Sequence, residues 1–374
     1  MFVDIYAIQT VPPSNINRDD TGSPKTALYG GVRRARVSSQ AWKRAMRQMM
    51  PAFLPEGSLG VRTKLAAELI AQRISKRDGE FQGEAAALAK DVLEALGIKI
   101  ESSTRVGDDE GKLASSYLIF ISISELDALA DVAIKWGREG KPKPAQCKKE
   151  AKAAFSGNRA VDIALFGRML ADVPQLNTDA SAQVAHAISV DRVTQEYDYF
   201  TAVDDEAADD NDGASMIGTV DFNSSTLYRY ATVNLESLRD QLGDDEATAR
   251  GITAFAEAFI RSMPTGKQNT FANRTLPSAV VVALREAQPI NVVSAFEVPV
   301  RPEGDASISQ IAAAKLGERL WEVQDAFDEP AVRAWNVTVG PSVAELDAVS
   351  EAASLKEMLS ALHDQVLVAL SPEA

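Results

Sequence analysis

Cysteine and histidine are nearly absent from this sequence. Its only cysteine is Cys147, and its only histidines are His186 and His363. A lone cysteine cannot form an internal disulfide, which favours a reducing cytoplasm. With so few thiols and imidazoles, the ligand patterns of zinc sites, such as HExxH or paired CxxC, are missing. We therefore expect no metal and no cofactor.

Long apolar segments and catalytic motifs are missing too. The sequence has no apolar run of about 18 residues and no signal-peptide pattern, which predicts a cytoplasmic protein that does not enter a membrane. Walker A, GxGxxG, GxSxG and Ser-His-Asp patterns are also absent, so we expect no enzyme activity of those kinds. The 374 residues, 45% of them hydrophobic, suffice for two or three packed units.

Positive charge is scarce overall but concentrated near the N-terminus. The whole chain has 39 basic and 53 acidic residues, a net charge of −14. Residues 1–50 instead hold eight basic residues and three acidic ones. A protein that binds nucleic acid indiscriminately should be basic overall. Any nucleic-acid site in this chain must therefore be local.

The basic stretch, residues 14–50, predicts a loop followed by a helix. Residues 14–31 are polar and punctuated by Pro and Gly, whereas 38–50 have helical spacing with Ser38 or Ser39 as the N-cap. The predicted apolar face consists of Trp42, Ala45, Met46 and Met49. The opposite face consists of Gln40, Lys43, Arg44 and Arg47.

A capped helix N-terminus beside a cationic stripe is suited to binding phosphate. The alternative is an ordinary solvated amphipathic helix. The basic run directly upstream favours the phosphate site, because these cations have no acid among them to offset their repulsion. That run is Arg33, Arg34 and Arg36.

The order of the remaining elements indicates an α+β fold. The predicted strands are 2–11, 160–170, 184–203, 226–235 and 278–284, and the predicted helices are several within 59–155, then 252–263 and 343–370. Strand–helix–strand, an insertion, and strand–helix–strand again is the order of a ferredoxin-like or RRM-like sheet with helices on one face and the other face free. The predicted parts are a discontinuous RRM-like palm over 1–58 and 157–342, an inserted helical subdomain over 59–156, and a C-terminal helix within 343–374.

A dense acidic segment interrupts the strand-like sequence. Residues 191–212 hold nine acidic residues and a single arginine, too much charge to pack in a core. Because both flanks are strand-like, we predict a long β-hairpin over 190–221 with an acidic tip at 204–213. The aspartate spacing does not match an EF-hand loop, so no calcium site is predicted.

A second basic segment follows the predicted helices of the insertion. It is either a surface that touches RNA or a neighbouring subunit, or a solvated linker and helix face. Its basic residues are Arg138, Lys141, Lys143, Lys148, Lys149 and Lys152.

Several segments resemble one known family. NRDD at 17–20 and KTALYGGVRRARVSSQAWKRA at 25–45 are similar to the N-terminal signature of the CasC family, the repeated backbone subunit of the type I-E CRISPR surveillance complex, Cascade. The resemblance continues through VDIALFGRM (161–169), AHAI (185–188), YFTAVDD (199–205), LYRYATVNL (227–235) and GKQ (266–268). It fades around 60–155 and after about residue 300.

The resemblance implies which residues bind RNA. In this family the hairpin, called the thumb, presses between nucleotides of a guide RNA, and an aromatic residue and a methionine matching Phe200 and Met169 flank a base step. Tyr199 stands where another member has tryptophan. The alternative is that these side chains only pack the root of the hairpin. The RNA-binding residues implied are Arg18, Lys25, Ser38, Gln40, Lys43, Arg44, Arg47, Arg168, Met169, Tyr199, Phe200 and Thr201.

The function implied is that of a non-catalytic, sequence-independent subunit that polymerises along CRISPR guide RNA (crRNA) in antiviral defence. Base pairing reads the target, while the protein holds the RNA backbone. The implied partners are the crRNA, further copies of the chain, the large, small, crRNA-end-capping and processing subunits of Cascade, and target DNA through guide pairing.

Two other functions remain open on the sequence. One is an RNA-cleaving backbone subunit of a related effector that uses Asp19 or Asp20, although adjacent aspartates mostly form turns or pair with a nearby arginine such as Arg18. The other is an interaction module that binds no RNA.

Overall fold

The computed structural model describes residues 1–103, 110–156, 160–202 and 216–371. The chain forms two compact units. The first, here called the sheet unit, comprises Met1–Met50, Gln183–Asn234 and Ile252–Ala374; the second, the helical unit, comprises Pro51–Ala182 and Leu235–Gly251. The insertion predicted at 59–156 lies within the helical unit, which also takes in 51–58, 160–182 and 235–251 from the predicted palm.

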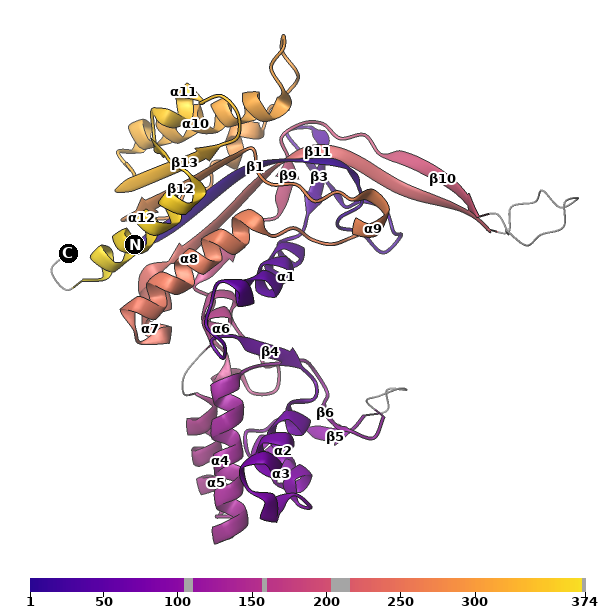
Figure 1. Cartoon of the computed structure of the whole chain (residues 1–374), viewed down its shortest axis with the longest axis vertical. Coiled ribbons are helices and arrows are strands. Elements are labelled where there is room, and N and C mark those ends of the chain that lie inside the picture. Colours follow the sequence, from indigo (N-terminus) through magenta and orange to yellow (C-terminus); the bar gives the residue numbers. More distant parts are fainter. Residues whose placement is uncertain (104–109, 157–159, 203–215, 372–374) are drawn as a thin grey trace, which may run out of the picture. The chain divides into compact units, whose positions relative to one another are not determined.

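One ten-stranded sheet contains most of the strands (Figure 1). Their order is β14-β13-β12-β1-β11-β9-β3-β2, and β8 and β10 also pair with β11. Strand β1 is antiparallel to both β11 and β12, whereas β13 and β14 are parallel. The bounds are β1 Phe2–Ser14, β2 Thr26–Tyr29, β3 Val32–Val37, β8 Ala182–Val184, β9 Ala187–Ser189, β10 Glu196–Ala202, β11 Met216–Asn234, β12 Ala279–Arg285, β13 Arg333–Thr338 and β14 Glu351–Ala352. The predicted α+β class is confirmed.

Helices cover both faces of the sheet around β1. Tyr6 and Ile8 of β1 pack in one core cluster with Leu316 of α10 (Ile308–Phe327). On the other face Arg229 of β11 contacts Trp42 of α1 (Ser39–Met49) and Phe259 of α8 (Asp245–Arg261). The predicted free sheet face is therefore wrong, because α10 was missed. Its buried residues Ala312, Ala313, Leu316 and Leu320 have helical spacing.

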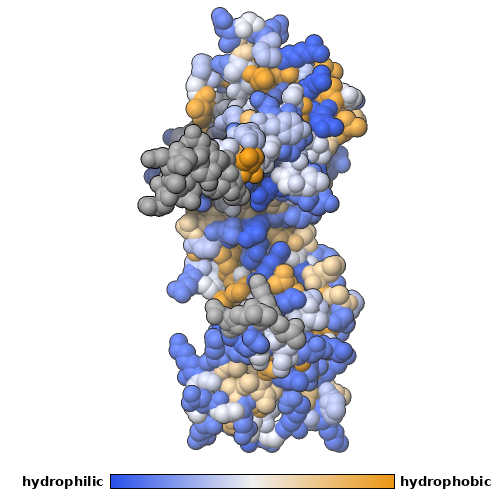
Figure 2. Space-filling model, turned by 90° about the vertical axis from the view of Figure 1, so that its right-hand side faces the viewer, coloured by the Kyte–Doolittle hydropathy of each residue, from blue (hydrophilic) through white to orange (hydrophobic). Residues whose placement is uncertain are grey.

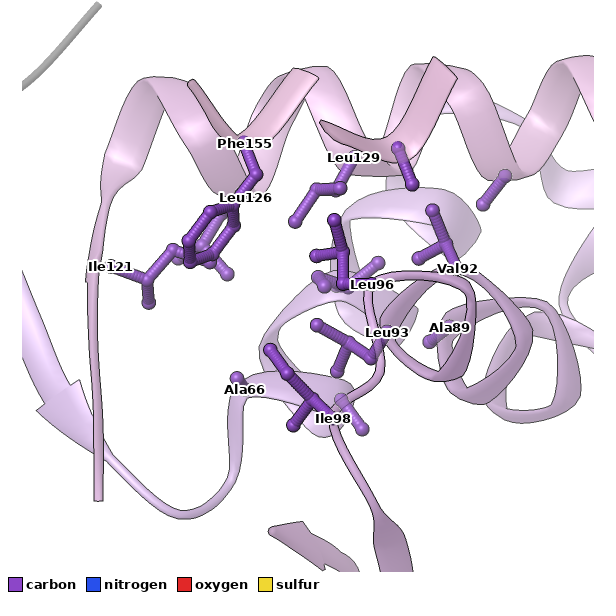
Figure 3. Close-up of a cluster of buried hydrophobic side chains, with 14 of the residues drawn as sticks. Ala66, Ala89, Val92, Leu93, Leu96, Ile98, Ile121, Leu126, Leu129 and Phe155 are labelled. Atoms are coloured by element: carbon purple, nitrogen blue, oxygen red, sulfur yellow. The ribbon is translucent and has the colours of Figure 1, made fainter. Parts of the chain in front are cut away.

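The helical unit is built around its own apolar core (Figure 3). Its elements are α2 Ala66–Arg77, α3 Ala85–Ala95, α4 Ile123–Glu139, α5 Pro144–Phe155, α6 Val161–Phe166, α7 Leu235–Leu242 and the strand pairs β4 Gly60–Thr63 with β7 Ile119–Ser122 and β5 Ile100–Ser102 with β6 Leu113–Ser115. Leu93 of α3, Leu129 of α4 and Phe155 of α5 meet in this core.

The strand predicted at 160–170 is wrong. Residues 161–166 form α6, and all six are buried. A short apolar run that is buried all round has no period, so it does not distinguish a strand from a buried helix. Asp162 of α6 accepts a hydrogen bond from the Gly60 N–H at 2.8 Å, which ties the helix to β4.

The predicted helix over 343–370 is also broken in the structure. It consists of α11 (Ala344–Asp347), the short strand β14 and α12 (Leu355–Leu370). Ser354 begins α12 with a capping box in which its hydroxyl accepts the Glu357 N–H. Such a cap marks a new helix start, and the sequence Ser-x-x-Glu at 354–357 is its signal. The small helix α9 (Gln268–Phe271) completes the sheet unit.

The face of the molecule shown in Figure 2 is mostly polar. Hydrophilic side chains cover most of the face shown in Figure 2, and apolar ones form small separate groups among them. Within the described residues, every helix is too short or too polar to span a bilayer.

Candidate nucleic-acid interface

Helix α1 begins directly after β3, with Ser38 as its N-cap. The Ser38 hydroxyl accepts the Ala41 N–H at 3.3 Å, and the Ser38 N–H donates to Oδ1 of Asn17 at 2.8 Å. Trp42, Ala45 and Met46 are buried. The opposite face, Gln40, Lys43, Arg44 and Arg47, is exposed or half-buried. The amphipathic helix and its cap are confirmed.

A groove of about 520 Å³ lies along the polar side of α1. Its walls are the loop at 16–18, residues of α1 and the loop at 264–267. Three cations, Arg18, Arg44 and Lys267, line the groove, and no acidic residue is among the described residues that line it. The structure thus brings four predicted residues into one place: Arg18, Ser38, Gln40 and Arg44.

Lys267 was not among the predicted site residues. Gly266 packs so closely on the basic loop that a Cβ there would overlap the carbonyl oxygen of Ile16. Lys267 follows with a left-handed backbone (φ 50°). This close approach brings a cation from residue 267 beside one from residue 18. The GKQ at 266–268 was the available signal, but sequence spacing alone does not show which distant loop it meets.

Asp19 holds a tight turn within the basic loop. Its Oδ1 accepts hydrogen bonds from the Thr21 hydroxyl (2.6 Å), the Thr21 N–H (2.9 Å) and the Ser23 N–H (3.1 Å). These bonds, led by that of the Thr21 hydroxyl, hold the pKa of the Asp19 carboxyl below its ordinary value. A carboxylate with a lowered pKa is a weaker base, so the geometry favours the turn over acid–base chemistry for Asp19.

Residues 26–37 form the β2–β3 hairpin, although 14–31 was predicted to be loop throughout. Arg34 of this hairpin is buried. Its guanidinium donates to five backbone carbonyls, those of Tyr29, Ser189, Val190, Phe296 and Glu297. The basic run Arg33, Arg34 and Arg36 was interpreted as favouring an anionic partner; Arg34 does not need one, because carbonyl oxygens satisfy its guanidinium inside the fold. Burial lowers its pKa.

The predicted hairpin arm is present as a two-stranded ribbon of β10 and the first part of β11, which runs out beyond the rest of the sheet (Figure 1). Tyr197 and Tyr199 share one of its faces, with exposed fractions of 67% and 63%. Phe200 lies on the other face, opposite Gly218. A Cβ on Gly218 would overlap the end of the Phe200 ring, so the ring lies against the partner strand at this glycine. The acidic tip at 204–213 lies outside the described residues.

Tyr199, Phe200 and Thr201 are all exposed at their places on β10. Phe200 remains 37% exposed despite its contact with Gly218. The ribbon root is fixed to the basic loop, because Asn15 donates to the Asp221 carbonyl and Ser23 donates to the Asp221 carboxylate. The aromatic residues are thus presented from an anchored strand.

Arg168 and Met169 belong to the helical unit and differ sharply. Met169 is 81% exposed. The Arg168 side chain is buried, with Nη1 2.8 Å from Glu125 Oε1 and its guanidinium 4.2 Å from the centre of the Phe155 ring. Glu125 offsets the charge of Arg168 inside the fold, so the geometry gives no support to the RNA contact expected of Arg168.

Part of the second basic segment is paired within the helical unit. Arg138 lies 2.7 Å from Asp78, and Lys141 lies 2.8 Å from Asp91. These pairs bind the end of α4 and the linker after it to the neighbouring elements. For these two residues the structure favours the solvated helix and linker face.

Comparison with known proteins places the chain in a family. The model of the CT1975-like protein family matches residues 3–363. A chain of a solved structure described as a "CRISPR RNA-guided surveillance complex, pre-nicking" is 33% identical, with 99% of this chain and 100% of that chain covered and a TM-score of 0.82. A chain of another "CRISPR RNA-guided surveillance complex" is 31% identical, with 98% and 100% covered and a TM-score of 0.72. No curated protein matches.

The family model spans nearly the whole chain, and both solved chains align over their full lengths. The segments that fade in sequence resemblance, around 60–155 and after about 300, are included in this match. The chain therefore belongs to the CT1975-like protein family, and its predicted relationship to the backbone subunit of Cascade is confirmed.

Proposed function

We propose that this chain is a non-catalytic backbone subunit that grips CRISPR guide RNA by its phosphates and polymerises along it. The observation that carries the proposal is the groove at α1, where Arg18, Arg44 and Lys267 meet beside a capped helix N-terminus. A cationic groove in a chain of net charge −14 is suited to a polyanion held at one defined place. Because the similar solved chains belong to RNA-guided complexes, we infer that this polyanion is guide RNA.

The sheet unit serves in this proposal as an RRM-like palm, and the β10–β11 ribbon as the thumb. Lys25, Lys43 and Arg47 extend the phosphate contacts beyond the groove. Phe200 interrupts the base stack of the guide, with Tyr199 and Thr201 beside it, and Met169 of the helical unit is a further RNA contact. Arg168 has no phosphate contact and instead stabilises the segment that carries Met169.

The chain then holds the guide backbone in the cytoplasm while base pairing selects target DNA. Its partners are further copies of itself and the other Cascade subunits, and catalysis belongs elsewhere in the complex. Asp19 supports a non-catalytic role for this chain, because its carboxylate accepts hydrogen bonds from Thr21 and Ser23 within a turn.

Co-expression with a guide RNA tests the proposal. The triple variant Arg18→Ala, Arg44→Ala, Lys267→Ala should purify with little RNA, whereas the wild type should carry RNA that absorbs at 260 nm. The matched control is Arg239→Ala, Arg250→Ala, Arg319→Ala, which removes three at least partly exposed cations that are ion-paired outside the groove. The control should retain RNA. A wild type free of RNA, or equal loss in both triple variants, would contradict the groove as the binding site and favour an interaction module.

A further inference from the structure

Lys25, Arg36 and His186 form a row at the edge of the sheet. Lys25 directly precedes β2, Arg36 lies in β3, and His186 directly precedes β9. The β2–β3 ladder pairs Thr26 with Ala35, and the Arg36 N–H donates to the Lys25 carbonyl at 2.9 Å, so Lys25 stands opposite Arg36. The β3–β9 ladder pairs Arg36 with Ile188. Because side chains two apart share a face, His186 lies on the same face as Arg36. The Arg36 Nη1 is 3.1 Å from the His186 Nδ1.

The surroundings of His186 are cationic. Burial, then the charge of Arg36, then the charge of Lys25 lower the pKa of His186. On the other side of β9, β11 places Tyr228 opposite Ile188, and burial raises the pKa of that phenol well above its ordinary value, so it is uncharged. The imidazole is therefore neutral at neutral pH, with Nδ1 accepting from Arg36.

Like charges opposite one another on neighbouring strands destabilise a sheet. Lys25 and Arg36 are nevertheless opposite each other, and both side chains are partly accessible, as is His186. A bound anion would offset their repulsion. Two cations and an imidazole are the donors that a phosphate group prefers.

The row adjoins the groove at α1. The Asn17 carbonyl accepts the Lys25 N–H at 2.9 Å, and the Asn17 side chain accepts the N–H of Ser38, the α1 cap, at 2.8 Å. Asn17 also lines the groove. Asn17 thus joins the groove to the row, so an RNA strand held in the groove passes close to the row.

We propose that Lys25, Arg36 and His186 together hold one phosphate of the guide RNA backbone next to the α1 groove. This inference rests on the proposed function and adds Arg36 and His186 to its RNA-binding residues. The phosphate offsets the two neighbouring cations, so His186 takes up a proton when RNA binds and donates from both ring nitrogens, with Arg36 turning its N–H groups to the phosphate.

In this proposal, RNA binding and protonation of His186 favour each other. His186 has a lowered pKa in the free chain and a raised pKa in the complex, so RNA affinity increases as pH falls between those two values. Each unit of difference between them corresponds to about tenfold in affinity. Above both values the affinity should not depend on His186 protonation.

The two histidines make the test direct, because His363→Asn leaves His186 as the only imidazole. NMR of histidine-labelled protein, titrated between about pH 5 and pH 8 with and without a short single-stranded RNA, should show the His186 pKa rising on binding. In the wild type, the ring signals of His363 should not respond to the addition of RNA. An unchanged His186 pKa in an RNA-bound chain would overturn this inference alone, whereas a chain that binds no RNA would overturn the proposed function with it.

Substitutions supply a second readout. His186→Asn should remove the pH dependence of RNA affinity, and its loss of affinity relative to the wild type should grow as the pH falls. Arg36→Ala should weaken binding, and the control Arg33→Ala, an exposed cation on the same strand, should weaken it less. A pH dependence that survives His186→Asn, or equal losses for the two arginines, would contradict the phosphate site.

Discussion

The guanidinium carbon of Arg229 lies 3.7 Å from the centre of the Trp42 ring. The same group lies 4.4 Å from the centre of the Phe259 ring. It donates to the Gln9 side chain at 2.6 Å and to the Phe259 carbonyl. One buried side chain of β11 thus ties β1, α1 and α8 together. It fixes the side of α1 that packs on the sheet and, with it, the side left for RNA.

Arg229 should therefore be important for stability. Burial lowers its pKa, and two aromatic faces, a carbonyl and an amide oxygen offset the cost of burying the charge. Arg229→Met should lower the free energy of unfolding by about 2–4 kcal/mol, because Gln9 loses its partner and the rings lose the cation. Urea unfolding measures this. The control Arg261→Met, on the exposed side of α8, should change it by about 0.5 kcal/mol or less, and equal effects would contradict the account.

The cationic face of α1 should act through phosphates and not through base identity. Lys43→Ala, Arg44→Ala and Arg47→Ala should each weaken guide binding alike for unrelated guide sequences. Each lost phosphate contact should flatten the log–log dependence of affinity on salt by about 0.7. Binding titrations at several salt concentrations measure the slope, with Arg319→Ala as the control for a general loss of charge. Three unchanged slopes would remove α1 from the interface.

The chain should have no ribonuclease activity, with or without divalent metal. The Asp19 carboxylate is held at a lowered pKa by its turn partners, which makes it a poor general base. Asp19→Ala and Asp20→Ala should both leave a labelled RNA as intact as the wild type does. Cleavage by the wild type that disappears in either variant would establish the RNA-cleaving alternative. Asp19→Asn keeps an acceptor for the turn and separates a loss of folding from a loss of chemistry.

Phe200 should separate two bases of the guide in the assembled complex. Stacking of a base on an aromatic side chain contributes about 1–3 kcal/mol, so Phe200→Ala should cost more than the loss of one phosphate contact. Permanganate footprinting should show regularly spaced reactive bases that vanish in this variant. Tyr197→Ala, on the other face of the ribbon, is the matched control and should keep the pattern. Uniform reactivity along the wild-type guide would leave Phe200 as a packing residue for Gly218.

Sequence patterns predicted what depends on local chemistry. The period of Trp42, Ala45 and Met46 located helix α1, and the hydroxyl of Ser38 located its start. The acidic run at 204–213 between strand-like flanks located the hairpin. In each case a short segment contains its own signal, because capping and amphipathic spacing act within a few residues.

The arginines show why the rest was not predictable. Arg34 and Arg168 have the same composition signal as Arg33 and Arg44, yet both are buried, one among backbone carbonyls and the other beside Glu125. Most of their partners, such as Val190 for Arg34 and Glu125 for Arg168, are distant in sequence, so no local pattern marks the two arginines as buried. Lys267 was missed for the same reason, since only tertiary packing of Gly266 brings it to the groove.

Polymerisation along the guide is the central claim, and nuclease protection as a function of guide length tests it most directly. The chain, assembled on guides of increasing length and treated with a single-strand-specific nuclease, should protect RNA that lengthens in equal steps, one step for each added copy. The triple variant Arg18→Ala, Arg44→Ala, Lys267→Ala should protect none at moderate salt. A protected length that stays constant as the guide grows, or guides digested at every length, would contradict the account.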